Sequence, residues 1–232
     1  MIMTDINISE RLKRISQYIP PKNKFADIGS DHAYLPCYVC LEDLSASAIA
    51  GEINQGPFQK ALEQVNRYDL QNRIEVRQGD GLSVIYPKEV QSVVIAGMGG
   101  TLITSILEQG HENLRGVKRI ITQPNINAKS IRQWFNEHNY DIVSEEVLEE
   151  DGYFYEIVVG DYSDSDLTTL SEKELYLGPI NLRNKGDAFI QKWSSVLDKK
   201  IHIVKQMKEA TQPDKVKITE FEQQINWIKE EL

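Results

Sequence analysis

The strongest constraint on the fold is a regular alternation of short apolar segments with amphipathic ones between residues 24 and 160. Five segments have the length and β-branched content of buried strands, and we expect strands at residues 24–28, 46–50, 73–77, 92–96 and 119–122. Between them lie helical patterns: one ending near residue 43, then 57–68, 101–109 and 128–138. Strands that alternate with helices predict a parallel sheet with helices on both faces.

The end of this pattern differs from its beginning. Residues 140–150 and 153–160 are both strand-like, and Asp151-Gly152 joins them. An Asp-Gly pair between two such segments predicts a tight turn, which makes the two strands antiparallel. A mostly parallel sheet that ends in an antiparallel hairpin is typical of the methyltransferase variant of the doubly wound sheet. We therefore expect an α/β, Rossmann-like class I methyltransferase sheet.

Helices are expected on either side of the sheet. Ser9 is a good N-cap for a short amphipathic helix that reaches about Ile15. After Tyr162 a linker-like stretch, residues 163–166, leads to two amphipathic patterns, residues 188–210 and a second after a break at 211–214. Two such helices predict an antiparallel, coiled-coil hairpin. The chain thus divides into a cofactor-binding domain at 1–162 and a helical substrate-binding domain at 163–232.

Composition says more about where the protein works in the cell than about what it binds. The net charge of −9 over 232 residues argues against nonspecific nucleic-acid binding by the whole surface, but it allows a local basic face. No apolar run approaches the roughly 20 residues of a membrane helix, and the N-terminus lacks the apolar core of a signal peptide. We expect a cytoplasmic protein, a monomer, without membrane or DNA partners.

Cys37 and Cys40 form a CxxC pair, which raises the question of a metal or redox site. Only one such pair exists and the four histidines are scattered, so no zinc set can form locally. The pair also lies inside a helical stretch rather than at its start, where a redox motif would lie. We expect both cysteines to be buried packing residues and no metal to be bound.

Ligands of open α/β sheets bind beyond the carboxyl ends of the strands, so the turns there hold the candidate site. The first turn contributes Asp27, Gly29, Ser30 and His32. Gly29 permits a tight turn and a close backbone approach. The chain has no Gly-Lys-Ser/Thr phosphate loop, and Asp27 and Asp31 would repel phosphate. They suit a cationic ligand, such as a sulfonium that also carries an ammonium group.

Three further turns extend this site. Glu52, with Asn54 beside it, is placed to accept hydrogen bonds from ribose hydroxyls, and Asp80 from an adenine amine, with Gly81 allowing close approach. Gly97, Met98 and Gly99 form an expected turn with little side chain, which leaves room for a substrate. Each turn alone could be merely structural. Four in sequence favour an adenosyl cofactor.

Gln123, Pro124 and Asn125 follow the fifth expected strand. Their amides, held beside a rigid proline, are candidates for positioning a planar base. A plain loop whose asparagine caps the next helix explains the same residues equally well.

Taken in order, three motifs carry a family resemblance: Asp27-Ile28-Gly29-Ser30-Asp31-His32-Ala33-Tyr34-Leu35-Pro36, Gly97-Met98-Gly99-Gly100 and Gln123-Pro124-Asn125. They resemble the bacterial tRNA (adenine(22)-N(1))-methyltransferase family, TrmK. The resemblance covers about residues 5–162, and the C-terminal helices by architecture. It implies S-adenosylmethionine as methyl donor, N1 of a tRNA D-loop adenine as acceptor, and a Rossmann-like domain followed by a coiled coil.

The chemistry that this resemblance implies needs no general base, because adenine N1 carries a free lone pair. Proximity and alignment are then the enzyme's main task. The alternatives are a methyltransferase acting on another RNA, a protein or a small molecule, and a non-catalytic cofactor-binding RNA module. The helical hairpin has a rival role in dimerisation or packing.

A tRNA would need contacts beyond one base, so we also expect a positive rim around the cleft, although exposed helix faces commonly carry such charges. The candidate basic residues are Arg11, Lys13, Arg14, Lys129, Arg132, Lys192, Lys199, Lys200, Lys205 and Lys208.

Overall fold

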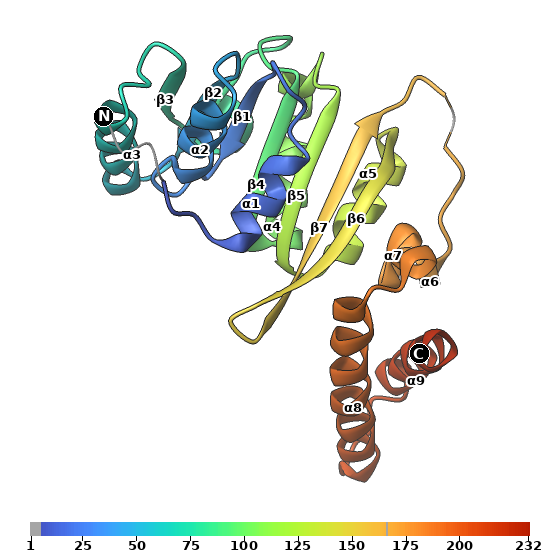
Figure 1. The fold of residues 1–232 in the computed structure, drawn as a ribbon. Coiled ribbons are helices and arrows are strands. Elements are labelled where there is room, and N and C mark those ends of the chain that lie inside the picture. The colour runs from blue at the N-terminus through green and yellow to red at the C-terminus, as the bar shows by residue number, and fades with distance from the viewer. Residues whose placement is uncertain (1–5, 166) are drawn as a thin grey trace.

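A single twisted sheet organises the computed structural model, which describes residues 6–165 and 167–232 (Figure 1). Within them the strand order is β3-β2-β1-β4-β5-β7-β6. The strands are β1 (Lys24–Ile28), β2 (Ser47–Glu52), β3 (Ile74–Gln78), β4 (Ser92–Gly99), β5 (Arg119–Ile126), β6 (Tyr140–Glu150) and β7 (Tyr153–Tyr162). All neighbours from β3 to β5 are parallel, whereas β7 is antiparallel to both β5 and β6. The predicted sheet and its final hairpin are confirmed.

Helices cover both faces of the sheet, and successive strand residues alternate between two apolar cores. Phe25 and Val94 belong to the core beneath α1 (Glu10–Gln17), α2 (Tyr34–Glu42) and α3 (Gln55–Arg67). Their chain neighbours Ala26 and Val93 belong to the core beneath α4 (Gly100–Gln109) and α5 (Ala128–Glu137). Two short 3₁₀ helices, η1 (Gly81–Val84) and η2 (His111–Leu114), complete the second layer. This alternation is the period-2 pattern of a strand buried on both faces.

Two strands run further than the sequence predicted. The turn expected at residues 97–99 and the loop expected at 123–125 are both wrong, because β4 continues to Gly99 and β5 to Ile126. Gly97 has a φ of +77°, and the pairing of the two strands shifts around it, with Met98 opposite Pro124. A bulge at a glycine bends the strand without ending the ladder. Residues 97–99 and 123–125 are therefore held in the sheet at the carboxyl ends of β4 and β5.

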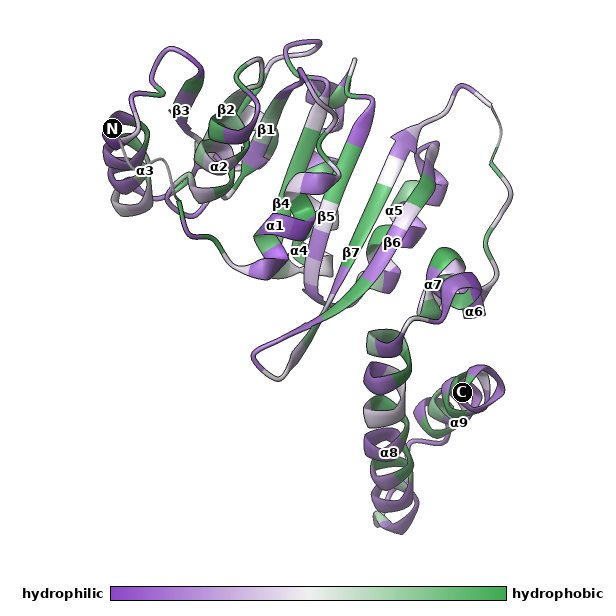
Figure 2. Ribbon diagram, viewed as in Figure 1, coloured by the Kyte–Doolittle hydropathy of each residue, from purple (hydrophilic) through white to green (hydrophobic). Residues whose placement is uncertain are grey.

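The C-terminal part contains four helices: α6 (Glu172–Leu177), α7 (Pro179–Asn184), α8 (Asp187–Glu209) and α9 (Lys215–Glu231). The last two form the predicted hairpin, and their banded purple and green colouring in Figure 2 reflects amphipathic helices. They run antiparallel, because Phe189 packs near Ile228 while Val204 packs near Ile218. The two six-residue helices before them were not predicted, since six residues are too few for helical periodicity to show.

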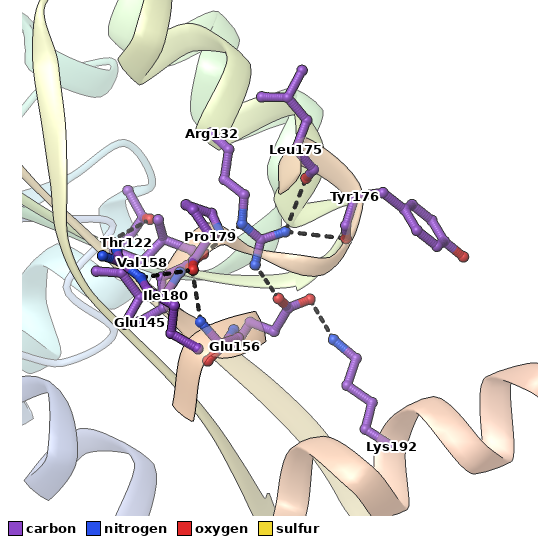
Figure 3. A network of polar contacts seen from close by, with 12 residues as sticks. Thr122, Arg132, Glu145, Glu156, Val158, Leu175, Tyr176, Pro179, Ile180 and Lys192 are labelled. Atoms are coloured by element: carbon purple, nitrogen blue, oxygen red, sulfur yellow. Dashed lines mark hydrogen bonds and ion pairs between the residues drawn. The ribbon is translucent and has the colours of Figure 1, made fainter. Parts of the chain in front are cut away.

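A buried ionic network attaches these helices to the sheet (Figure 3). Arg132 of α5 is fully buried between Glu145 of β6 and Glu156 of β7, and Lys192 of α8 binds Glu156 from the other side. Glu145 also accepts hydrogen bonds from the backbone amides of residues 180 and 181 in α7. The expectation that Arg132 belongs to an exposed basic rim is wrong, because its side chain is buried. Lys192 is also part of the network, since it is paired with Glu156.

The cysteines are packing residues, as predicted. Cys37 and Cys40 are free thiols with no exposed surface in the core between α2 and the sheet. Burial raises the pKa of Cys37 to about 12 and that of Cys40 to about 11, so both stay protonated.

Across the described ranges, no helix has both the length and the apolarity that crossing a bilayer requires.

Candidate functional site

A cavity of about 560 Å³, here called the central cavity, opens at the carboxyl ends of β1 and β4. The strand order reverses between these two strands, which is where open α/β sheets bind ligands. Six residues predicted for the cofactor or substrate line it: Asp27, Gly29, Ser30, Gly97, Met98 and Asn125. The structure therefore brings these six predicted residues together around one cavity.

The turn after β1 is held tightly against β2. The amides of Gly29 and Ser30 both donate to the carbonyl oxygen of Gly51, at 2.9 and 3.1 Å. Gly29 has a φ of +69°, and a Cβ at this position would collide with the Met98 side chain. The residues that follow, 31 to 33, also have positive φ, although none is a glycine. Left-handed residues in succession are strained and cluster at ligand sites.

Carboxylates give this end of the cavity a negative character. Asp27 is almost fully buried, and burial raises its pKa to about 7, although the Ser30 hydroxyl donates to it at 2.6 Å and opposes that rise. Burial also raises the pKa of Glu52, whose Oε1 accepts a hydrogen bond from the His32 amide at 3.2 Å. Asp31 lines the same cavity and is exposed. A cation entering here would gain from each of these groups.

A chain of amide hydrogen bonds shapes the opposite wall. Gln123 is fully buried, and its Oε1 accepts hydrogen bonds from the Gly97 amide at 3.2 Å and from the Arg11 guanidinium. Its Nε2 donates to Asn125 Oδ1 at 3.3 Å, and Asn125 Nδ2 donates to the Gly97 carbonyl at 2.8 Å. Gln123 therefore fixes the orientation of the exposed Asn125 rather than facing the cavity itself.

The remaining predicted residues do not line the central cavity. Glu52 accepts a hydrogen bond from the backbone amide of His32. Asn54 precedes the first turn of α3. Asp80 and Gly81 line a separate cavity of about 370 Å³ beside η1. Pro124 lines a third one, beside the C-terminal helices. Gly99 is the last residue of β4, and Gln123 lies within β5.

The sequence analysis missed the cavity's other wall. Arg11, expected only as an RNA contact, reaches in from α1 and lies 5.1 Å from the centre of the Tyr155 ring. Tyr153, Phe154 and Tyr155 come from the tip of the β6–β7 hairpin. Three successive aromatic residues after an Asp-Gly turn were the available signal, since Tyr155 packs against the core but Tyr153 is 67% exposed.

The side chains around the central cavity are suited to binding and orienting a ligand. No group of three or more potential metal ligands occurs in the part of the chain that the structure describes. The groups around the central cavity are carboxylates, amides, one guanidinium and aromatic rings. Such groups hold a cation and a flat ring close together.

The chain is similar in sequence and fold to known proteins over nearly its whole length. Residues 25–230 match the family model described as TrmK, tRNA (adenine(22)-N(1))-methyltransferase. A Bacillus subtilis protein of that description is 43% identical over 98% of both chains. The crystal structure of the B. subtilis M1A22 tRNA methyltransferase TrmK superposes with a TM-score of 0.90 at 41% identity, covering 97% of this chain and 99% of that one. A Streptococcus pneumoniae protein solved in complex with S-adenosyl-L-methionine gives a TM-score of 0.86 at 35% identity, with the same coverage.

Proposed function

Because the chain belongs to the TrmK family of tRNA (adenine(22)-N(1))-methyltransferases, we propose that it methylates N1 of adenine 22 in tRNA, with S-adenosylmethionine as the donor. The observation that carries this proposal is the central cavity, which brings the buried Asp27 and the exposed Asp31 together with the oriented amide of Asn125 at the switch point of the sheet. The family match extends through the C-terminal helices to residue 230, and we propose that these helices contribute to substrate binding.

The residues at the strand ends fit the cofactor. Asp31, and Asp27 in its ionised form, supply negative charge for a ligand that carries a sulfonium and an ammonium group. Gly29, with a φ of +69°, lets the backbone turn tightly at this point, and the end of the Met98 side chain lies where a Cβ would be. Glu52 is the last residue of β2 and Asp80 follows β3, and the parallel register of these strands brings their ends to the same edge of the sheet. Glu52 and Asp80 remain the predicted holders of the ribose and the adenine. S-adenosylmethionine supplies an electrophilic methyl group when bound.

The protein's contribution to the reaction is to align the acceptor. Adenine N1 attacks with its own lone pair, so no side chain has to remove a proton first. Asn125 is held by hydrogen bonds at both of its amide atoms, and it lines the central cavity together with Phe154. A fixed amide and an aromatic ring restrict how a base can enter, and such alignment can supply up to about 7–11 kcal/mol.

The decisive experiment uses labelled S-adenosylmethionine, unmodified tRNA and nucleoside analysis of the product. We expect one 1-methyladenosine per tRNA, and none in a tRNA with guanine at position 22. Methylation of a protein or small molecule instead would move the chain to another substrate class. Cofactor binding without methyl transfer to any RNA would make it a binding module.

The cofactor site has its own test. Glu52→Gln weakens a charged acceptor, and hydrogen bonds to charged groups contribute about 1.5–3 kcal/mol each, so we expect at least roughly ten-fold weaker cofactor binding. The exposed Glu63→Gln on α3 is the matched control. Unchanged affinity by calorimetric titration would remove Glu52 from the site.

A further inference from the structure

A second cavity of about 390 Å³, here called the hairpin cavity, lies between the end of β5 and the C-terminal helices. It adjoins the central cavity, because Asn125 and Phe154 line both. Its other walls come from α6, α8 and α9, which contribute Tyr176, Val196 and Gln224 among others. A ligand in one cavity therefore lies next to a ligand in the other.

The lining of the hairpin cavity suits a flat, uncharged ring. Tyr176 and Trp193 contribute aromatic surface, with ring centres 5.0 Å apart, and Phe154 and Val196 add apolar surface. Trp193 Nε1, a donor, and Gln224 Oε1, an acceptor, are both buried and find no partner among the described residues. Unpaired buried polar atoms are rare in folded proteins, and each one calls for an explanation.

Both lysines that line the hairpin cavity are already paired. Lys192 binds Glu156, and Lys129 binds Glu172. Glu220 accepts a hydrogen bond from Gln224 Nε2. The cavity therefore offers little to a phosphate, which prefers unpaired cations. A neutral base with hydrogen-bonding edges fits better than the backbone of a nucleic acid.

The reaction itself creates a base in need of such a site. Adenine N1 lies on the Watson–Crick edge, so the target base must be unpaired and moved out of its stack to reach a methyl donor. That movement exposes one face of the neighbouring base, and proteins commonly cover such faces with aromatic side chains. We propose that the hairpin cavity binds the nucleobase that flanks the target adenine in the RNA. This proposal rests on the proposed function and adds a second base-binding site to it.

The test fills the hairpin cavity without touching the central one. Val196→Trp places a large side chain into it from α8, and Val216→Trp on α9 is the matched control, since Val216 is 82% exposed and does not line the cavity. We expect kcat/KM for tRNA to fall by about 5- to 150-fold in Val196→Trp, the loss that corresponds to one base–aromatic stack. Cofactor affinity should stay unchanged in both variants.

Substrates that lack one base separate this role from general damage. RNAs with an abasic site on either side of the target adenine should react slowly with the parent enzyme at one of the two positions. At that position Val196→Trp should cause no further loss. If the variant loses activity equally on intact and abasic RNA, or loses none, the cavity binds no flanking base.

A milder variant covers the case in which Val196→Trp does not fold. Gln224→Leu keeps the size of the side chain and removes its acceptor atom, and it should also raise the KM for intact tRNA but not for the sensitive abasic RNA. Failure of the parent enzyme to methylate tRNA would overturn the proposed function. Full activity of both variants beside an active parent would overturn only the second base site.

Discussion

Replacing Arg132 by methionine tests how the C-terminal helices are attached to the sheet. Arg132 has no exposed surface, and its removal leaves the carboxylates of Glu145 and Glu156 buried (Figure 3). Breaking a buried ion pair by deleting one partner costs about 3–5 kcal/mol. Glu156 keeps Lys192, and Glu145 keeps two backbone amides, so we expect the lower end, about 3 kcal/mol.

The pH dependence of this loss distinguishes charge from packing. In the parent, the neighbouring cations hold the pKa of Glu156 at about 2, below its ordinary 4.5, so its stabilising effect persists down to about pH 4.5 and is lost towards pH 2. In Arg132→Met the carboxylates that lose this cation should bind protons more readily than in the parent. They then take up protons in the folded state as the pH falls, and the variant's deficit should shrink between pH 7.5 and pH 5.

Urea unfolding, followed by circular dichroism at both pH values, measures the effect. A loss of about 3 kcal/mol corresponds to a midpoint shift of about 1 M or more. The control is Arg115→Met, which removes an exposed ion pair with Glu112 and should change stability by less than about 1 kcal/mol. A small loss in Arg132→Met, or a large loss that does not change with pH, would refute the electrostatic account.

Three further predictions concern the site and its surroundings. Folded Asp27 keeps its proton to about pH 7, whereas its ordinary pKa is 3.8, so the cofactor-free protein should lose thermal stability as the pH rises from about 4 to 7. Asp27→Asn should remove that loss and weaken cofactor binding above pH 7; an unchanged pH profile contradicts the raised pKa. The double Cys37→Ala, Cys40→Ala variant should bind cofactor and methylate nearly as the parent does; activity that depends on reductant in the parent alone contradicts a packing role. Changing the exposed Lys199 and Lys205 to glutamate should raise the KM for tRNA and flatten its salt dependence, with unchanged cofactor affinity in calorimetry; an unaltered KM would show that this face of α8 does not meet RNA.

The sheet was predictable because its signals are local. Each buried strand is an apolar run of about the right length, and Asp151-Gly152 fixes the direction of the last two strands through one turn. The positions of Asp27, Gly29 and Gly97 followed from the strand ends alone. What failed was the end of β4, since a glycine-rich stretch reads as a turn unless its pairing partner is known. That partner, Pro124, lies 26 positions away.

The site was less predictable where it depends on contacts between distant segments. Arg11 enters the central cavity because α1 packs near the β6–β7 hairpin, where Glu150 accepts hydrogen bonds from the first amides of the helix. Nothing near Arg11 in the chain signals this. Gln123 and Asn125 were both predicted from the sequence, but their different roles were not. Gln123 is buried and orients Asn125, and the sequence does not show which of the two is buried. Burial of a single polar side chain is a tertiary property.

The basic residues show most clearly why a count of charges does not locate an RNA surface. Arg132 and Lys192 looked equivalent to the exposed lysines of α8, yet both are spent on holding Glu145 and Glu156 inside the protein. In this chain of net charge −9, two of the positive side chains are thus paired inside the protein and do not face an RNA. The same network forms one side of the hairpin cavity, since Glu156 and Lys192 both line it. Weakening the attachment of α8 should therefore alter how the protein holds its RNA before it alters how it binds the cofactor.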